Sequence, residues 1–277
     1  MKYLQTRSDD GTTIRLARWN DTGKKNVLLV HGFSEHLGRY QHVGQFFAEK
    51  GWRVTGLEFR GHGKSGGKRG HVQRWVHFFE DLQAAMSTVR QPMAIVGHSL
   101  GGLITLWSTM HPLTPKVTAI ALSNPLLGLV DKPSRKLVFI GKSLARIFPK
   151  CVVSRDSKPE LLSRDPAVVE AFATDPMVCA DVTARMGQQT IKALRTVKTN
   201  AANFSIPVRL LLGGQDRVCD PSAAKEFAAN YGGEITTVVY EQCFHELFNE
   251  PEKYQILEET EYWIDQQHRK TILSIDK

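Results

Sequence analysis

The sequence has few cysteines, and their spacing is not that of a zinc site or a redox pair. The four cysteines of this 277-residue chain are scattered singly, without any C-x-x-C string. Cysteines of this kind are usually unpaired thiols in a reducing compartment. We therefore predict no metal, no cofactor and no disulfide framework.

Long hydrophobic runs are also missing. The first residues, MKYLQTRSDDGTT, contain no apolar core of a signal peptide. No run approaches the roughly 20 apolar residues that cross a bilayer. Hydrophobic residues make up 42% and charged residues 23%, as in ordinary globular proteins. We expect a cytoplasmic protein with one large domain, into which a smaller segment is inserted.

The chain has fewer acidic than basic residues. The chain has 36 Lys and Arg against 28 Asp and Glu, which gives a net charge of +8. An excess of positive charge favours anionic partners such as phospholipid surfaces or nucleic acid. Nucleic-acid motifs and basic stripes interleaved with aromatic residues are missing, so we expect no nucleic-acid partner.

Apolar runs typical of buried strands alternate with segments of helical spacing. The strand-like runs span residues 26–32, 53–59, 93–97, 117–125, 208–216 and 234–243. The helical segments span residues 39–51, 78–90, 100–111, 222–232 and 251–269. Ahead of them, the turn-forming string DDG at 9–11 predicts a hairpin. This alternation predicts an α/β protein with a mainly parallel, doubly wound sheet.

The strand pattern stops between about residue 125 and about residue 205. Prolines punctuate short helical patterns there, at Pro133, Pro149, Pro159, Pro166 and Pro176. The alternation resumes with VRLLLGGQD from residue 208. We predict that residues 126–205 form a helical cap, inserted into a single α/β domain made of residues 1–125 and 206–277.

A serine between glycines stands where a strand-like run ends and a helical pattern begins. The string GHSLG places Ser99 between Gly97 and Gly101. A chain of this length contains G-x-S-x-G by chance about one time in ten, so the neighbouring pattern decides. A tight strand-to-helix turn needs glycines and exposes the serine hydroxyl at the carboxyl end of the sheet. This predicts a nucleophile elbow with Ser99 as the catalytic nucleophile.

A serine becomes a good nucleophile when a base takes its proton and a carboxylate orients that base. At such an elbow the acid and then the histidine follow later strands. Asp216 ends LLLGGQD and His245 follows TTVVYEQCF, which predicts a triad of Ser99, Asp216 and His245. Asp220, one short loop further on, is the alternative acid. His268 lies in the polar string DQQHRK, where we expect a solvated surface position.

The loop after the first buried strand, HGFSEHLGRY, lies at the same edge of the predicted sheet. An oxyanion hole at such a site takes one N–H from the residue after the nucleophile and one from this loop. We predict the backbone N–H groups of Leu100 and Phe33. We expect His31 to be a packed, hydrogen-bonded turn residue, and His98 to shape the turn beside the serine.

Several strings together resemble one known family. HGFSEHLGRY, FRGHGKSGG, GHSLGG, DRVCD and FHEL are similar to the monoacylglycerol lipase and lysophospholipase branch of the α/β-hydrolases. The match covers the whole α/β part in order, whereas the insertion matches only loosely around residues 175–185. The resemblance implies an α/β-hydrolase fold with a helical cap. It also implies a serine esterase that cleaves single-chain lipid esters through an acyl-enzyme on Ser99.

The resemblance further implies roles for three supporting residues. Glu35 and Arg39 match a charged pair of the family string that braces the site and is associated with the polar glycerol end. A purely structural ion pair is the alternative. Cys219 matches a family cysteine near the acid loop, which implies sensitivity to thiol reagents without a catalytic role. Phe33 and Leu37 stand where mammalian members have small residues, which leaves the substrate open.

The insertion supplies an independent clue about partners. Residues 126–200 contain thirteen Lys or Arg against seven Asp or Glu. One helical face in residues 136–150 carries the apolar side chains Leu137, Ile140, Leu144, Ile147 and Phe148. Lys142 and Arg146 lie opposite. Such a helix suits docking on an anionic membrane and a passage for an acyl chain. An ordinary helix packed on the core has the same pattern.

Two other functions stay open. An aminopeptidase or other amidase on the same fold would need acidic groups to hold a substrate ammonium, and the basic insertion argues against it. A lipid-binding module without catalysis would keep the fold alone. The presence of all three triad residue types argues against that function.

Overall fold

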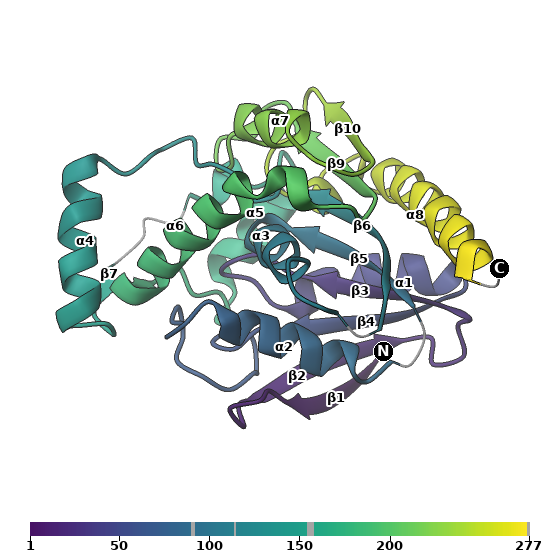
Figure 1. Ribbon diagram of the computed structural model, residues 1–277, viewed down its shortest axis with the longest axis horizontal. Helices are drawn as coiled ribbons and strands as arrows, with labels where there is room; N and C mark the ends of the chain where they lie inside the picture. The colour runs from purple at the N-terminus through teal and green to yellow at the C-terminus, as the bar shows by residue number, and fades with distance from the viewer. Residues whose placement is uncertain (90–91, 114, 154–157, 276–277) are drawn as a thin grey trace.

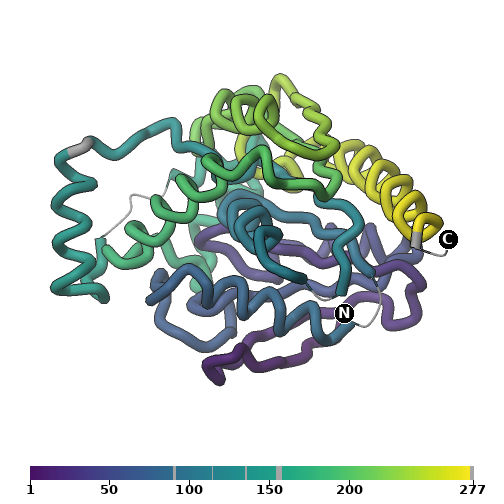
Figure 2. The backbone as a smooth tube through the Cα atoms, in the orientation of Figure 1, coloured from purple at the N-terminus to yellow at the C-terminus, as the bar shows by residue number. Residues whose placement is uncertain are grey.

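The computed structural model describes residues 1–89, 92–113, 115–153 and 158–275, which are drawn in Figures 1 and 2. Its centre is an eight-stranded sheet with the order β1-β2-β4-β3-β5-β6-β9-β10. The strands are β1 (Lys2–Arg7), β2 (Thr13–Trp19), β3 (Lys25–Val30), β4 (Trp52–Glu58), β5 (Met93–His98), β6 (Val117–Ser123), β9 (Val208–Gly213) and β10 (Ile235–Tyr240). β2 pairs antiparallel with β1 and β4, and the remaining pairs are parallel. The predicted mainly parallel sheet is confirmed.

Both faces of the sheet are buried, which explains the continuous apolar runs of its central strands. In β3, Val27 and Leu29 face one hydrophobic cluster, whereas Leu28 and Val30 face the other. The first cluster is covered by α1 (Gln41–Glu49) and α8 (Lys253–Ile275). The second is covered by α2 (Val76–Met86), α3 (Ser99–Ser108), α6 (Ala184–Thr199) and α7 (Pro221–Ala229). Figure 1 shows these helices around the sheet.

The carboxyl ends of two helices differ most from the sequence prediction. The helix expected over 78–90 is α2, which ends at Met86, and the expected last residue, Arg90, lies outside the described residues. The final helix runs to Ile275 instead of 269, because no glycine or proline stops it. Within the described part of the chain, no helix is both long and apolar enough to cross a membrane.

The segment between β6 and β9 is mostly helical. It contains α4 (Arg135–Ile147), β7 (Val152–Val153), η2 (Pro159–Leu161), α5 (Pro166–Thr174), β8 (Val182–Thr183), α6 and η3 (Ala201–Asn203). β7 and β8 form a short antiparallel pair that the sequence pattern did not predict, because two residues carry no periodicity. α4 is the outermost element at the left of Figure 1.

The last part of this segment belongs to the main core. Met186, Ala193 and Val197 of α6 are buried in the same cluster as the sheet and α3. The division into a catalytic domain and a cap of residues 126–205 stays a prediction, and α6 shares the packing of the α/β part.

Candidate active site

Ser99 occupies the turn between β5 and α3. Its φ of 48° lies in the left-handed region, which strains a residue with a side chain. The turn also passes very close to the end of β3. A Cβ on Gly101 would lie 2.3 Å from the carbonyl oxygen of His31 and 2.6 Å from that of Val30. The glycine after the serine is therefore required by contact between two backbones.

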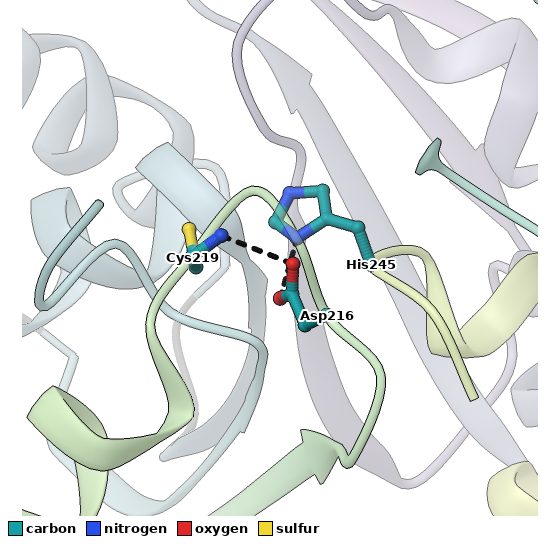
Figure 3. A group of neighbouring side chains, drawn as sticks. All are labelled: Asp216, Cys219 and His245. Atoms are coloured by element: carbon teal, nitrogen blue, oxygen red, sulfur yellow. Dashed lines mark hydrogen bonds and ion pairs between the residues drawn. The ribbon is translucent and has the colours of Figure 1, made fainter. Parts of the chain in front are cut away.

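Three buried side chains from separate loops meet at this turn. Ser99 Oγ lies 3.0 Å from His245 Nε2, and His245 Nδ1 lies 2.8 Å from Asp216 Oδ2. The other oxygen of Asp216 accepts the N–H groups of Val218 and Cys219 at 2.7 and 3.0 Å. Figure 3 shows Asp216 between His245 and Cys219. Asp216 follows β9 and His245 follows β10, so parallel strands deliver both to the edge where Ser99 stands.

This geometry would allow His245 to accept a proton from Ser99. Burial by itself would lower the pKa of His245, but the charge and hydrogen bond of Asp216 outweigh burial and raise that pKa. The bond from Nδ1–H to Asp216 also leaves Nε2 as the acceptor that faces the serine. The arrangement can support nucleophilic attack by Ser99 on a carbonyl carbon.

Asp220, the alternative acid, and His268, the other late histidine, both lie outside the group of Ser99, Asp216 and His245. Asp220 caps α7, where its carboxylate accepts the N–H of Ser222 at 2.9 Å. His268 is not on the solvated surface as predicted; it is buried, with Nδ1 2.9 Å from Thr118 Oγ1 and its ring against Trp52. That prediction was wrong because α8 turns this position toward the sheet, although its sequence neighbours are polar.

The loop after β3 lies against Ser99. A Cβ on Gly32 would be 3.1 Å from Ser99 Cβ, and the Gly32 N–H donates to Glu35 Oε1 at 2.6 Å. Phe33 is half-buried, with its ring edge-on to His62, and Leu100 is buried in the first turn of α3. The oxyanion-hole roles of the Phe33 and Leu100 N–H groups stay predictions.

Glu35 and Arg39 of the same loop form an ion pair, and Arg39 also binds a third residue, Glu246. Arg39 Nη1 lies 3.1 Å from Glu35 Oε2, and the guanidinium also binds Glu246 through two contacts of 2.7 Å. The sequence analysis missed Glu246. The available signal was a carboxylate directly after the predicted catalytic histidine, in a chain whose HGFSEHLGRY string also supplies an arginine.

A second residue that the sequence analysis missed is Asn124, directly after β6. Its Nδ2 donates to the carbonyl oxygens of Phe244 and His245 at 3.0 and 2.7 Å, and its Oδ1 accepts the Gly213 N–H at 2.8 Å. Its φ of 41° is a conformation that asparagine tolerates better than most residues. Asn124 thus holds the backbone of the histidine loop.

Two further histidines lie beside the triad. His31 is buried and hydrogen-bonded, since Nε2 accepts the Phe59 N–H at 3.2 Å and Nδ1 donates to Gly32 O at 2.7 Å. The ring of His98 lies 4.8 Å from that of His245. Burial lowers the pKa of His98, so this imidazole is neutral near pH 7.

Cys219 is the cysteine beside Ser99. Its Sγ lies 3.9 Å from Ser99 Oγ. The ligand atoms of Asp216, Cys219 and His245 lie within 4.8 Å of one another, a spacing that a metal ion could use. The hydrogen bonds of Asp216 and His245 already account for these donors and acceptors in the triad arrangement.

A serine at a strand-to-helix turn, with aspartate and histidine after later parallel strands, defines the class of α/β-hydrolases. Residues 21–252 match the family described as "Serine aminopeptidase, S33", and the chain belongs to this family.

Similar proteins of known name identify the branch of the family to which the chain is most similar. The chain is 33% identical over 246 residues to the monoacylglycerol lipase of Mycolicibacterium smegmatis, covering 86% of this chain and 87% of that protein. It is 26% identical to the phospholipase YtpA of Bacillus subtilis, covering 87% and 95%. The crystal structure of Paleococcus ferrophilus monoacylglycerol lipase matches with a TM-score of 0.82 and 26% identity, covering 92% of this chain and 99% of that one. These likenesses confirm the predicted α/β-hydrolase fold and the monoacylglycerol lipase-like branch, and the chain is a serine ester hydrolase.

Proposed function

We propose that the protein hydrolyses carboxylic esters of single-chain lipids, with monoacylglycerols and lysophospholipids as the leading substrates. The observation that carries this proposal is the hydrogen-bonded series from Ser99 Oγ to His245 at 3.0 Å and from His245 to Asp216 at 2.8 Å. Relatives named monoacylglycerol lipase and phospholipase support a lipid ester as the substrate.

In the proposed reaction Ser99 Oγ attacks the ester carbonyl carbon while His245 Nε2 takes the hydroxyl proton. The N–H groups of Phe33 and Leu100 stabilise the negative oxygen of the tetrahedral intermediate. Its collapse breaks the bond to the alcohol, which leaves with the proton from His245, and an acyl-enzyme remains. Water then repeats the cycle and releases the fatty acid.

An amide substrate is the second candidate, because the matching family is described as a serine aminopeptidase family. An aminopeptidase needs a carboxylate for the substrate ammonium. The neighbouring carboxylates Glu35 and Glu246 are both already bound to Arg39, so neither side chain is free to hold a substrate ammonium. This pairing supports an ester over an aminoacyl amide.

We also propose that α4 docks on an anionic lipid surface. Large apolar side chains of α4, and of Phe148 directly after it, are highly exposed: Leu137 57%, Phe139 72%, Ile140 51%, Ile147 67% and Phe148 63%. Packing of α4 against α6 buries Ala145 instead. The apolar face is thus not covered by the core, and exposed Lys142 and Arg146 suit anionic head groups.

The test is kcat/KM for monoacylglycerols and lysophospholipids of several chain lengths, with Ser99→Ala as the control. We expect one head group to be preferred, and the variant to lose activity by about 10⁴-fold or more. Wild-type rates in the variant would contradict the mechanism. Weak activity confined to short esters would contradict the lipid substrate, and faster cleavage of aminoacyl amides would favour the amidase.

A further inference from the structure

Glu246 directly follows the proposed catalytic base, yet its side chain points into a separate buried network. The residue is 4% exposed, and its two carboxylate oxygens each accept a hydrogen bond of 2.7 Å from Arg39. Asn249, in η4 (Leu247–Asn249), adds a third hydrogen bond at 2.9 Å. Planar, bidentate pairing of this kind fixes orientation as well as distance.

The network continues from Arg39 to the loop that lies against the nucleophile. Arg39 also contacts Glu35 at 3.1 Å, and Glu35 Oε1 accepts the Gly32 N–H at 2.6 Å. Gly32 is the residue whose Cβ would lie 3.1 Å from Ser99 Cβ. A continuous series of polar contacts therefore connects the histidine loop with the loop beside the serine.

The side chains of the network are largely buried. The Arg39 side chain is 10% exposed, and the ring of Phe172 in α5 covers its guanidinium, with the central carbon 4.9 Å from the ring centre. Tyr40 donates its hydroxyl to Glu35 Oε1 at 2.9 Å. Removal of one partner from such a buried pair is costly, because the other charge stays buried without compensation.

The charges of the network do not cancel. Burial favours the neutral form of Glu246, but Arg39 outweighs burial and lowers the pKa of that carboxyl, so it is ionised at neutral pH. Two carboxylates thus share one guanidinium. His98, whose Nε2 lies 3.9 Å from Glu35 Oε1, is neutral because burial lowers its pKa. One negative charge remains beside the imidazole pair of His98 and His245.

We propose that Glu246 is a positioning residue for the hydrolytic reaction. Through Arg39 and Glu35 it holds the loop of Gly32 and Phe33 against Ser99, and its charge favours the protonated form of His245 that arises during attack. This inference rests on the proposed function, in which His245 is the base and Phe33 supplies an oxyanion N–H.

Several titratable, charged or polar groups besides Glu246 surround His245. They are Ser99 and His98 at the β5–α3 turn, Asp216 and Cys219 after β9, and Glu35 with Arg39 after β3. The variant Glu246→Gln changes none of these residues. It removes one negative charge and weakens the bond to Arg39 with little change of shape.

The experiment measures kcat and KM of the full-length Glu246→Gln protein on a chromogenic acyl ester across pH. We expect kcat to fall about ten-fold with little change in KM, because a misplaced oxyanion loop weakens binding of the transition state. We also expect the acidic limb of kcat/KM to move to lower pH. Loss of a negative charge lowers the pKa of His245, so the base stays deprotonated in more acidic solution.

Glu261→Gln is the matched control. Glu261 of α8 is a buried carboxylate bound to Trp52 Nε1 at 2.7 Å and near Lys25 Nζ at 3.5 Å. These partners begin β4 and β3, at the edge of the sheet opposite the triad. We expect this variant to lose thermal stability while it keeps the wild-type acidic limb.

The outcomes separate this inference from the proposed function. An inactive Ser99→Ala protein together with wild-type kcat and acidic limb in folded Glu246→Gln would overturn the positioning role alone. Activity in Ser99→Ala would overturn both. If Glu246→Gln does not fold, Glu246→Asp keeps the charge but shortens the reach to Arg39. A reduced kcat with an unshifted acidic limb then supports the inference, and an unreduced kcat overturns it.

Discussion

At the scale of single residues, the site combines a strained turn with buried, mutually satisfied polar groups. Ser99 holds a positive φ, which is stable only because the surrounding packing determines it. Gly101 permits this packing because a side chain there would collide with the carbonyl of His31. The proposed nucleophile is therefore held by contacts that are independent of its own chemistry.

Replacement of Asp216 by asparagine tests the orientation of the base. The amide keeps the size of the side chain but removes the charge and favours the wrong tautomer of His245. We expect kcat to fall about 10⁴-fold, as in other triads. The residual activity should have its acidic limb at lower pH, because the carboxylate that raises the pKa of His245 is gone. The measurement is kcat/KM against pH.

Asp220→Asn is the control for that experiment. Asp220 caps α7 and makes no hydrogen bond to His245 among the contacts of the described residues. We expect nearly wild-type kcat and nearly wild-type stability, because asparagine caps a helix about as well as aspartate does. The reverse pattern, in which Asp220→Asn is inactive and Asp216→Asn is active, would assign the acid to Asp220.

At the scale of elements, the insertion has two differently anchored parts. The loop before α5 is tied to the histidine loop, since Leu162 O accepts the Glu246 N–H at 2.7 Å and Ser163 Oγ donates to Asn249 O at 2.9 Å. Arg164 adds an ion pair to the buried Glu250 at 2.8 Å. α4, in contrast, packs against α6 and turns large apolar side chains outward.

Substitution of two exposed isoleucines of α4 by glutamate tests the proposed membrane contact. We expect the double variant Ile140→Glu and Ile147→Glu to bind anionic phospholipid vesicles about ten-fold more weakly, because both apolar side chains leave the interface and negative charge enters it. Hydrolysis of a water-soluble ester should be unchanged, since both positions are exposed. Vesicle co-sedimentation at two salt concentrations measures the binding.

Leu273→Glu on α8 is the matched change at an exposed apolar position far along the chain from α4. We expect it to bind vesicles like the wild type. Equal binding by the α4 variant and the wild type would contradict docking through α4. Binding that is insensitive to salt would contradict the role of the basic side chains.

At the scale of the whole molecule, buried neutral histidines connect the stability of the fold to pH. Burial lowers the pKa of His31 to about 4 and that of His62 to about 3. The two rings lie 5.2 Å apart, so a proton on one also disfavours a proton on the other. Both side chains therefore stay neutral in the folded protein at mildly acidic pH.

The fold should lose stability as pH falls below 6.5, the usual pKa of the unfolded imidazole. Between pH 6.5 and about 4 the unfolded chain binds protons at His31 and His62 that the folded chain does not bind. Each histidine then costs about 2 kcal/mol at pH 5. We expect the free energy of unfolding, measured with urea, to be lower at pH 5 than at pH 7. A His62→Gln variant should show a smaller difference between these two pH values, and equal stability of the wild type at both would contradict the assignment.

Much of the architecture was determined by the sequence itself. The apolar runs at 26–32, 93–97 and 208–216 predict strands buried on both faces, and the helical spacing between them predicts parallel pairing. Because the carboxyl ends of parallel strands share one edge, the same pattern predicts that Ser99, Asp216 and His245 approach one another. These features depend on local periodicity and on chain order, which a sequence displays directly.

Only the tertiary structure decided which distant side chains complete the site. Arg39 meets Glu246 across 207 positions of the chain, and Asn124 reaches the His245 carbonyl across 121. The buried position of His268 contradicts the prediction from its polar sequence neighbours. Whether the apolar face of α4 is covered was open in the sequence, because an amphipathic pattern does not identify what covers it. Such pairings depend on how the loops and helices pack in three dimensions, and local residue patterns carry no information about that packing.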